Sequence, residues 1–410
     1  MRVLVLAQYY DPVPVPKPGE VARWLAAQGH DVSVLTGLPN YPSGVLMPGY
    51  RLTPWRRETR DNLSVRRVFE LPYHGRSALG RMLNYSSFMV AGSIAALFIR
   101  RPTVVYAWHP PLTVGVVAAV LASIRRAPFV YDVQDVWPDS ALMSGMLREG
   151  AITSVLRKVE RFVYRRAAHL LVVTESARQN LIAKGAVPDR ISVIPHWVDE
   201  SAFATPDADA RSWAGRFLEK DGRFVVTFAG NIGLLQRLDT ILHAAKRVTD
   251  TRIAFRIVGD GADRPRLERL AKELGLGNVR FLGARPSGDM SAVFAESDAL
   301  VVPFGAGPLS ELVIPTKTLA YLAAGRPIVM AMSGPATRMV DEAGAGVAVP
   351  PDDPEGLAAA VEELARRSES DRQAMGERGR AYALAHFRRD DVMKTIEGIL
   401  ESVSATSATD

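Results

Sequence analysis

The chain has 410 residues, 48% of them hydrophobic and 23% charged, and it contains no cysteine. This length suggests about two domains, and the composition is typical of globular rather than disordered proteins. The absence of cysteine excludes disulfides and cysteine–metal sites. The net charge of +6 is uneven, because residues 1–200 hold 24 Lys+Arg and 15 Asp+Glu, a net of +9, and the remainder has a net of −3.

A basic half can meet nucleic acid, anionic lipid or a phosphorylated substrate. No helix-turn-helix, zinc-finger or RNA-binding signature is present, so we do not expect a nucleic-acid partner. Met1 and Arg2 lead into an apolar run that is too short for a signal peptide. We therefore expect a cytoplasmic protein.

In the first half, short apolar runs alternate with longer helical patterns, which is typical of a parallel sheet covered by helices. A Pro-rich loop follows the first run, and a helix is expected at 20–28, ended by Gly29. The expected strands are residues 3–9, 32–36, 65–69, 104–108, 129–133, 170–174 and 192–194.

The stretch 205–222 is polar, has no strand pattern, and is interpreted as the domain junction. Asp207-Ala208-Asp209 has the spacing of a metal-binding motif, but in the junction we interpret it as solvated linker. A second strand series follows, at residues 224–228, 254–258, 279–282, 299–303, 328–331 and 346–349, and a last helix is expected over 390–403. The predicted domains are 1–204, 205–389 and a C-terminal helix with a frayed tail, 390–410.

The most apolar stretch is 82–99, with Arg81 before it and Arg100-Arg101 after it. Its length borders on that of a membrane span. Three interpretations stay open: a helix buried against the sheet, a helix that also lies in a membrane surface, and a true span, which would split one domain.

In open parallel sheets, ligands bind beyond the carboxyl ends of the strands. In the second half, the loops at these ends are rich in glycine, which lets backbone N–H groups approach an anion or simply makes a tight turn. The candidate donor residues in these loops are Gly230, Asn231, Gly233, Gly259, Asp260, Gly261 and Arg285.

A longer loop follows the strand at 299–303 and contains Glu311, Thr316 and Lys317. Lys317 stands near a helix start, where it is either a solvated lysine or a point charge on a phosphate. Glu311 can accept hydrogen bonds from sugar hydroxyls.

The order of these loops resembles the donor domain of family 4 retaining glycosyltransferases. The matching stretches are AGNIGLLQRLDTILHA (229–244), RIVGDG (256–261), RFLGARP (280–286) and PTKTLAYLAAGRPIV (315–329). The first half resembles the acceptor domain of the L-fucosamine-transferase-like members, which build O-antigens, capsules and exopolysaccharides. There the matching stretches are HDVSVLTGLPNYPSG (30–44), YDVQDVWPDSAL (131–142) and VTESARQNLIAKGAVPDRISVIPHWVD (173–199).

The resemblance implies a GT-B fold, with two Rossmann-like domains facing each other across a cleft and a C-terminal helix that crosses back to the first domain. It implies transfer of a sugar from a nucleotide-sugar, UDP-linked, with retention of configuration and without a metal or other cofactor. We hypothesise that the acceptor is a polyprenyl-diphosphate-linked sugar, used at an anionic membrane surface on the inner face of the cell membrane. The basic first half and the apolar stretch 82–99 with arginines at both ends point to it, as does a cluster of arginines that could lie on anionic lipid. The cluster consists of Arg51, Arg56, Arg57, Arg60, Arg66 and Arg67.

The chain departs from the family at charged positions of the donor site. Many members place an Arg and a Lys on the diphosphate, where this chain has Asn231 and Gln236. Arg237 can substitute, and Lys317 becomes the leading candidate for the diphosphate charge. The family's first glutamate aligns near Glu311, and Ala320 stands in place of the second.

On the acceptor side, many members carry a His before an Asp, where this chain has Gln134 and Asp135. Asp135 either accepts the acceptor proton or caps a helix after the Trp-Pro turn. His109 and His196 follow strands at the same edge and either contact substrate or are structural. The expected catalytic residues are thus Glu311, Lys317 and Asp135.

Three other functions stay open. A nucleotide-sugar epimerase or hydrolase could use the same fold. An NAD-dependent enzyme would carry G-x-G-x-x-G after its first strand, where this chain has Asp-Pro-Val-Pro. A sugar-nucleotide sensor without activity would tolerate the replaced charged residues.

Overall fold

The computed structural model describes residues 1–75, 77–143, 147–198 and 204–409, so Asp199 of the matching stretch at 173–199 lies outside the described residues. By its internal contacts the chain forms two compact units. Unit 1 comprises Met1–Pro195 and Met393–Asp410, and unit 2 comprises His196–Val392. Each unit is built around one sheet of mainly parallel strands, which confirms the predicted pair of Rossmann-like domains.

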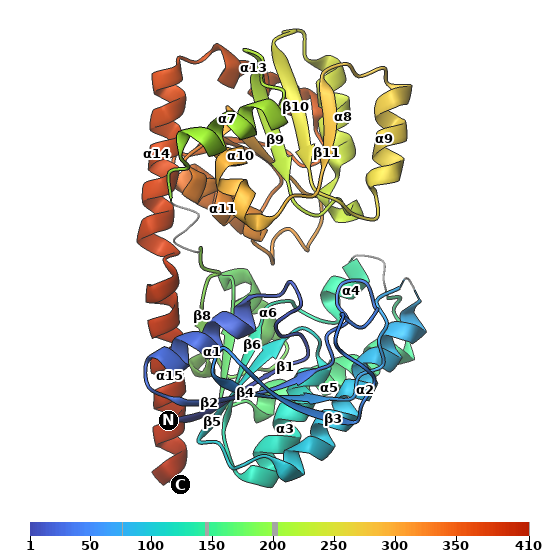
Figure 1. The fold of residues 1–410 in the computed structure, drawn as a ribbon, viewed down its shortest axis with the longest axis vertical. Helices are drawn as coiled ribbons and strands as arrows, with labels where there is room; N and C mark the ends of the chain where they lie inside the picture. The colour runs from blue at the N-terminus through green and yellow to red at the C-terminus, as the bar shows by residue number, and fades with distance from the viewer. Residues whose placement is uncertain (76, 144–146, 199–203, 410) are drawn as a thin grey trace. The chain divides into compact units, whose positions relative to one another are not determined.

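The sheet of unit 1 has eight strands in the order β3-β4-β2-β1-β5-β6-β7-β8 (Figure 1). All neighbours are parallel except β3 and β4, which form an antiparallel pair at one edge. The strand β3, rich in charged residues, has no apolar pattern and was not predicted. The bounds are β1 Arg2–Ala7, β2 Asp31–Gly37, β3 Trp55–Arg60, β4 Leu63–Val68, β5 Val104–His109, β6 Phe129–Val133, β7 His169–Val172 and β8 Ile191–Val193.

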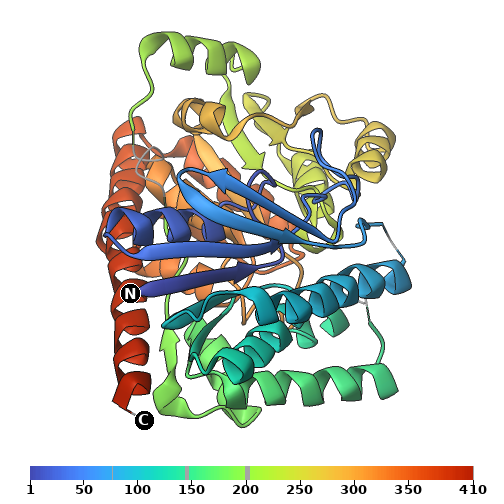
Figure 2. The same ribbon diagram turned by 60° about the horizontal axis from the view of Figure 1, so that its bottom comes forward.

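The helices of unit 1 cover its sheet because each buries an apolar stripe. Figure 2 shows α2, α3 and α5 side by side along one face, where one core joins them to the sheet through residues such as Phe88, Val117 and Val163. The bounds are α1 Lys17–Ala27, α2 Ala78–Ala95, α3 Thr113–Arg125, α4 Asp139–Met143, α5 Ala151–Arg166 and α6 Glu175–Ala183, with 3-10 turns η1 Ala96–Phe98 and η2 Pro188–Arg190. The last helix, α15 Arg389–Thr409, belongs to unit 1 from Met393 onward.

The C-terminal helix α15 packs beside α1 (Figure 2). Glu397 of α15 is hydrogen-bonded to Trp24 at 3.3 Å and to His30 Nε2 at 2.8 Å, while His30 Nδ1 lies 3.1 Å from the N-terminal nitrogen of Met1. His30, Glu397 and Glu401 are the one described group close enough to share a cation. Since both ring nitrogens of His30 already have partners, the cluster fastens α15 to unit 1.

The stretch 82–99 forms most of α2 and η1. The buried residues of α2 are Asn84, Phe88, Gly92 and Ala95, which recur every three or four positions and lie on one face of the helix. Within the described residues, none of the helices combines the length and the apolar character that crossing a bilayer requires.

Unit 2 has six parallel strands in the order β11-β10-β9-β12-β13-β14 (Figure 1). This is the doubly wound order, and it reverses direction between β9 and β12. The bounds are β9 Phe224–Ala229, β10 Ile253–Val258, β11 Val279–Gly283, β12 Ala299–Pro303, β13 Ile328–Ala331 and β14 Gly346–Val349.

The helices of unit 2 form two layers with separate cores. One core joins the sheet to α8, α9 and α13, and the other joins it to α10, α11, α12 and α14 (Figure 1). The bounds are α7 Ala208–Phe217, α8 Leu238–Arg247, α9 Arg264–Glu273, α10 Met290–Glu296, α11 Thr316–Ala324, α12 Pro335–Glu342, α13 Pro354–Arg366 and α14 Glu369–His386, with 3-10 turns η4 Leu234–Gln236 and η5 Ser287–Asp289.

Asp207, Ala208 and Asp209 are exposed, as expected, but the interpretation of these residues as linker was wrong. Asp207 caps α7, because its carboxylate accepts a hydrogen bond from the backbone N–H of Ala210 at 2.7 Å. The helix belongs to unit 2, since Ala214 and Leu218 are fully buried there. A polar stretch without strand pattern is equally compatible with a capped helix that buries only a few residues.

Candidate functional site

The order of the strands places a crevice in unit 2 at the carboxyl ends of β9 and β12, the topological switch point. The loops after β9 and β10 interlock there. The N–H of Gly230 donates to the carbonyl of Val258 at 2.9 Å, and the N–H of Ile232 donates to that of Asp260 at 2.9 Å. The predicted donor loops therefore form one continuous surface.

Glycine is required in these loops for two reasons. Gly230 and Gly259 have φ angles of 141° and 145°, which side chains rarely permit. A Cβ on Gly259 would lie 1.9 Å from the carbonyl oxygen of Gly230, and one on Gly261 would lie 2.3 Å from that of Ile232. Bare backbone at this edge can come into direct contact with a ligand.

A hollow of about 410 Å³ opens beside these loops. It brings together five predicted donor residues, and α10 closes it through Met290 and Phe294. The five are Gly230, Asn231, Gly259, Asp260 and Arg285. Arg285 is held by Asp289 at 3.1 Å, and its guanidinium lies 4.9 Å from the ring centroid of Trp213.

Lys317 lies next to this hollow, in the first turn of α11. Its Nζ is buried without a hydrogen-bond partner among the described residues, and it lies 3.9 Å from the ring centroid of Phe228. A Cβ on Gly230 would be only 3.2 Å from that Nζ. Burial lowers the pKa of Lys317 from 10.5 to about 7. The lysine is thus held, without a counter-charge, behind the glycine loop.

Tyr321, one turn further along α11, was not predicted as a site residue. Its hydroxyl accepts a hydrogen bond from the N–H of Ala229 at 2.7 Å and donates to the carbonyl of Ala229 at 3.1 Å. It therefore fixes the end of β9 to the helix that carries Lys317. The spacing in the sequence could have indicated this, because Tyr321 follows Lys317 by four positions and so lies on the same helix face.

Asn231 and Gln236, which stand where many family members have an Arg and a Lys, lie close together. A Cβ on Gly233 would be 2.9 Å from Asn231 Nδ2 and 2.8 Å from Gln236 Oε1, so two neutral amide side chains flank this glycine. They occupy the region in which the resemblance implies an Arg and a Lys.

Gly233 and Gly261 do not line the hollow, and three predicted donor residues with longer side chains also lie outside it. Arg237 is paired with Asp352 at 2.6 Å, and its side chain is 44% exposed. Glu311 is exposed and lies 3.5 Å from Arg338. Thr316 is exposed at the start of α11, whose first turn has no side-chain cap.

Of the residues predicted at the carboxyl edge of unit 1, His109 is buried and the others are half-buried. His109 is 1% exposed, and burial lowers its pKa to about 3, so its ring is neutral at physiological pH. Burial also raises the pKa of Asp135, an effect that Ser140 and the backbone of Val136 oppose. His196 is partly buried and lies at the start of unit 2.

Gln134 belongs to a small buried network. It donates to Asp132 Oδ1 at 2.5 Å, and the hydroxyl of Tyr106 donates to the other oxygen of the same carboxyl. Asp132 is 4% exposed, and burial raises its pKa. The carboxyl of Asp132 therefore fixes the side chain of Gln134 at the end of β6.

A second buried network centres on Glu70, which sequence reasoning missed. Its Oε1 accepts hydrogen bonds from Gln8 at 2.9 Å, Asn40 at 2.9 Å and Asn84 at 2.8 Å. All four side chains are at most 1% exposed, and burial raises the pKa of Glu70 to about 7. The carboxyl thus joins the loops after β1, β2 and β4 to α2.

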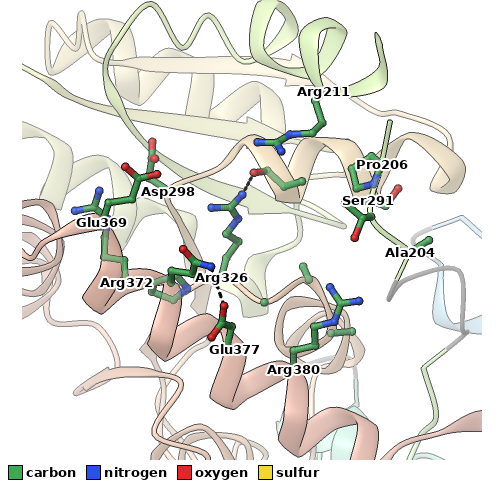
Figure 3. Close-up of a pocket in the computed structure, with 17 residues that line it drawn as sticks. Ala204, Pro206, Arg211, Ser291, Asp298, Arg326, Glu369, Arg372, Glu377 and Arg380 are labelled. Carbon is green, nitrogen blue, oxygen red and sulfur yellow. Dashed lines mark hydrogen bonds between the residues drawn. The ribbon is translucent and has the colours of Figure 1, made fainter. Parts of the chain in front are cut away.

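A further pocket of unit 2, of about 400 Å³, lies at the amino ends of the strands, opposite the crevice (Figure 3). Asp298 and Pro327, which directly precede β12 and β13, line it together with four arginines. All four are engaged: Arg211 binds Glu296 at 2.7 Å, and Arg326 donates to the carbonyl of Ala295. Arg372 donates to the carbonyls of Leu364 and Arg367, and Arg380 also has a partner. No predicted site residue lines this pocket.

Comparison with known proteins gives two family matches in chain order. Residues 18–197 match the glycosyl transferase 4-like domain, and residues 223–367 match the glycosyl transferases group 1. The chain is 28% identical to WcaI of Escherichia coli, named for colanic acid biosynthesis, over 79% of this chain and 82% of that one. It is 29% identical to the glycosyltransferase WbjE of Pseudomonas aeruginosa, over 65% and 66%.

Solved structures share the fold. HepE of Anabaena, in complex with UDP and glucose, superposes with a TM-score of 0.73 at 18% identity, covering 98% of this chain and 100% of that one. Sucrose-phosphate synthase of Thermosynechococcus elongatus gives 0.79 at 18% identity, with 98% and 99% covered. The two domain matches and the shared fold together place the chain in the family 4 glycosyltransferases of GT-B fold.

Proposed function

We propose that the enzyme transfers a sugar from a UDP-linked donor to a lipid-linked saccharide, with retention of configuration. One observation carries the donor assignment: the buried Nζ of Lys317, without a hydrogen bond, lies behind the glycine loop at the switch point. A diphosphate bound at this loop would supply the missing counter-charge. The structure of HepE with UDP and glucose supports this class of donor.

In the proposed reaction, the acceptor hydroxyl oxygen forms a bond to the anomeric carbon, and the bond from that carbon to the diphosphate oxygen breaks. The bonding electrons leave with the diphosphate, and the hydroxyl proton passes to it or to Asp135. The protein's task is electrostatic, because charge accumulates on the leaving diphosphate. Lys317, the backbone N–H groups of the glycine loop and the uncapped first turn of α11 would stabilise that charge.

The proposed acceptor is a polyprenyl-diphosphate-linked sugar, used by a peripheral protein at the inner face of the cell membrane. The net charge of +9 on residues 1–200 supports it, because anionic lipid attracts a basic surface. The name of WcaI, which refers to colanic acid biosynthesis, supports an acceptor of this kind. No specific observation favours an epimerase, a hydrolase or a sensor.

A screen of UDP- and GDP-sugars for thermal stabilisation tests the donor assignment. A donor at 100 times its Kd should stabilise the protein by about 2.7 kcal/mol. The best donor is then incubated with a lipid-linked acceptor in detergent, and transfer is followed by product mass. Stabilisation by no nucleotide-sugar, or donor consumption without a glycosylated product, would contradict the proposed transfer.

A further inference from the structure

The helix α2 and the turn η1 carry two apolar faces instead of one. The first, around Phe88 and Gly92, packs on the sheet. The second points away from the core, and its residues recur at helical spacing. They are Leu79, Leu83, Val90, Ile94, Leu97 and Phe98, with exposures between 49% and 66%. A surface helix normally has polar residues there, so this face is suited to an apolar partner.

A groove of about 710 Å³ runs along this second face. Its other wall comes from β3 and the segment after β4. It is lined by Pro54, Trp55, Phe69, Leu71, Leu83, Ser86, Ser87, Val90, Ala91, Ile94, Ala95 and Phe98. The hydroxyl of Ser87 is already satisfied, because it donates to the carbonyl of Asn84 at 2.7 Å and accepts from the N–H of Leu71 at 2.9 Å. The groove is therefore suited to a hydrocarbon chain.

Two guanidinium groups lie against residues that line the groove. Arg57 and Arg66 are directly opposite each other in the antiparallel pair of β3 and β4, where like charges are unfavourable. Arg57 lies 5.8 Å from the ring centroid of Trp55, and Arg66 donates to the carbonyl of Phe98 at 3.1 Å. Among the described residues, neither forms an ion pair with a carboxylate. An anion bound between them would relieve the repulsion.

We propose that this groove and the Arg57–Arg66 pair bind an anionic lipid of the bilayer, with its hydrocarbon chain in the groove and its phosphate on the two arginines. The inference deepens the proposed membrane location and rests on it, because it names the surface that contacts the membrane. The combination of an apolar groove with two adjacent cations lacking a counter-charge selects a phospholipid over an apolar protein partner.

The neighbouring arginines Arg56 and Arg67 have a different role, although the sequence groups all four in one basic stretch. They lie on the other face of the same strand pair. Arg67 is fully buried and binds Glu58 at 2.8 Å, and Arg56 lies 3.2 Å from the same carboxylate. The expectation that the whole stretch lies on the membrane therefore does not hold for Arg67, because a buried guanidinium cannot reach a lipid phosphate.

Trp55 provides a direct readout of chain insertion. The full-length protein is mixed with vesicles of phosphatidylcholine and phosphatidylglycerol whose acyl chains carry bromine, which quenches nearby tryptophan fluorescence. We expect quenching that Trp55→Phe removes. Ile94→Glu, which places a charge in the groove, should abolish it, whereas Ile152→Glu on α5, 54% exposed outside the groove, should leave it intact.

Arg57→Gln and Arg56→Gln form a matched pair, because each removes one positive charge from adjacent positions on opposite faces. Arg57→Gln should weaken vesicle affinity about fivefold, the contribution of one near-surface cation, and Arg56→Gln should leave it unchanged. Equal losses in the two variants, or quenching that survives Ile94→Glu, would overturn the proposal. Transfer to a detergent-solubilised acceptor does not depend on vesicles, so its failure would instead count against the proposed function.

Discussion

The buried charged groups at the carboxyl edges of the two sheets differ in their hydrogen bonding. In unit 1, the carboxyl of Glu70 is bonded to three amide side chains, and that of Asp132 is bonded to a tyrosine and a glutamine. In unit 2, the ammonium of Lys317 has no hydrogen bond and no carboxylate partner among the described residues. Buried side-chain networks fix the positions of loops, even though Glu70 Oε2 and Gln134 Oε1 have no hydrogen-bond partner among the described residues. A buried charge without a partner, in contrast, lowers stability until a ligand arrives.

The contrast suggests a division of work. The edge of unit 1 is already ordered and presents loops of fixed shape, which suits recognition of the neutral, hydroxyl-rich sugar of the acceptor. The edge of unit 2 keeps one cation and bare glycine backbone available, which suits a polyanionic leaving group. Substitutions at the first edge should therefore act mainly on stability and those at the second mainly on donor binding.

The largest effect is expected at Glu70. Glu70→Ala leaves one N–H of each of three buried amides without its acceptor, while the other N–H keeps its partner. The substitution should lower the free energy of unfolding by about 3 kcal/mol or more, measured by urea denaturation. Glu70→Gln keeps an acceptor oxygen and should cost much less at neutral pH. Because the pKa of Glu70 is raised to about 7 in the folded state, ionisation costs stability as pH rises from 4.5 to 7, and this loss should vanish in Glu70→Gln.

At Lys317, the expected effects on stability and on binding have opposite signs. Lys317→Met removes a desolvated charge, so the unliganded protein should become more stable at or below pH 7. The same change should weaken donor binding by about 1.5–3 kcal/mol, the contribution of a charge-assisted hydrogen bond. Calorimetric titration with UDP measures the second effect, and Lys246→Ala, exposed on α8, is the control. Unaltered UDP affinity in Lys317→Met would end its assignment to the diphosphate.

Donor affinity should depend on pH through the same lysine. Below pH 7 Lys317 is already protonated, so UDP affinity should be nearly constant. Above pH 7 the unliganded protein releases this proton and binding must restore it, so the Kd should rise by up to about tenfold per pH unit. Titrations in buffers of different ionisation enthalpy would count the protons taken up. A pH slope that persists in Lys317→Met would assign the proton to another group.

A smaller effect is expected at Tyr321, which connects α11 to the end of β9. Tyr321→Phe keeps the ring but removes both hydrogen bonds to Ala229. We expect stability to fall by about 1 kcal/mol and donor affinity to fall modestly, because the glycine loop loses its fixed position. Stability that falls while UDP affinity stays the same would show that the loop does not depend on this contact.

The sequence alone predicted the fold class and the donor loops. Buried parallel strands give apolar runs, and glycines at strand ends mark close backbone approach, so both are local signals. The same reasoning grouped Gly230, Asn231, Gly259, Asp260 and Arg285, which the structure brings to one hollow. The roles of these residues in binding and catalysis stay predictions.

What only the tertiary structure decided depends on pairing between distant residues. Glu70 follows a strand with no unusual pattern, and the neighbouring sequence does not predict its three amide partners at positions 8, 40 and 84. Arg56 and Arg57 are adjacent in sequence, yet strand alternation sends one to Glu58 and the other to the groove. Composition and periodicity determine which segments become strands and helices, but burial and charge partnership are set when those segments pack, because the partners come from far along the chain.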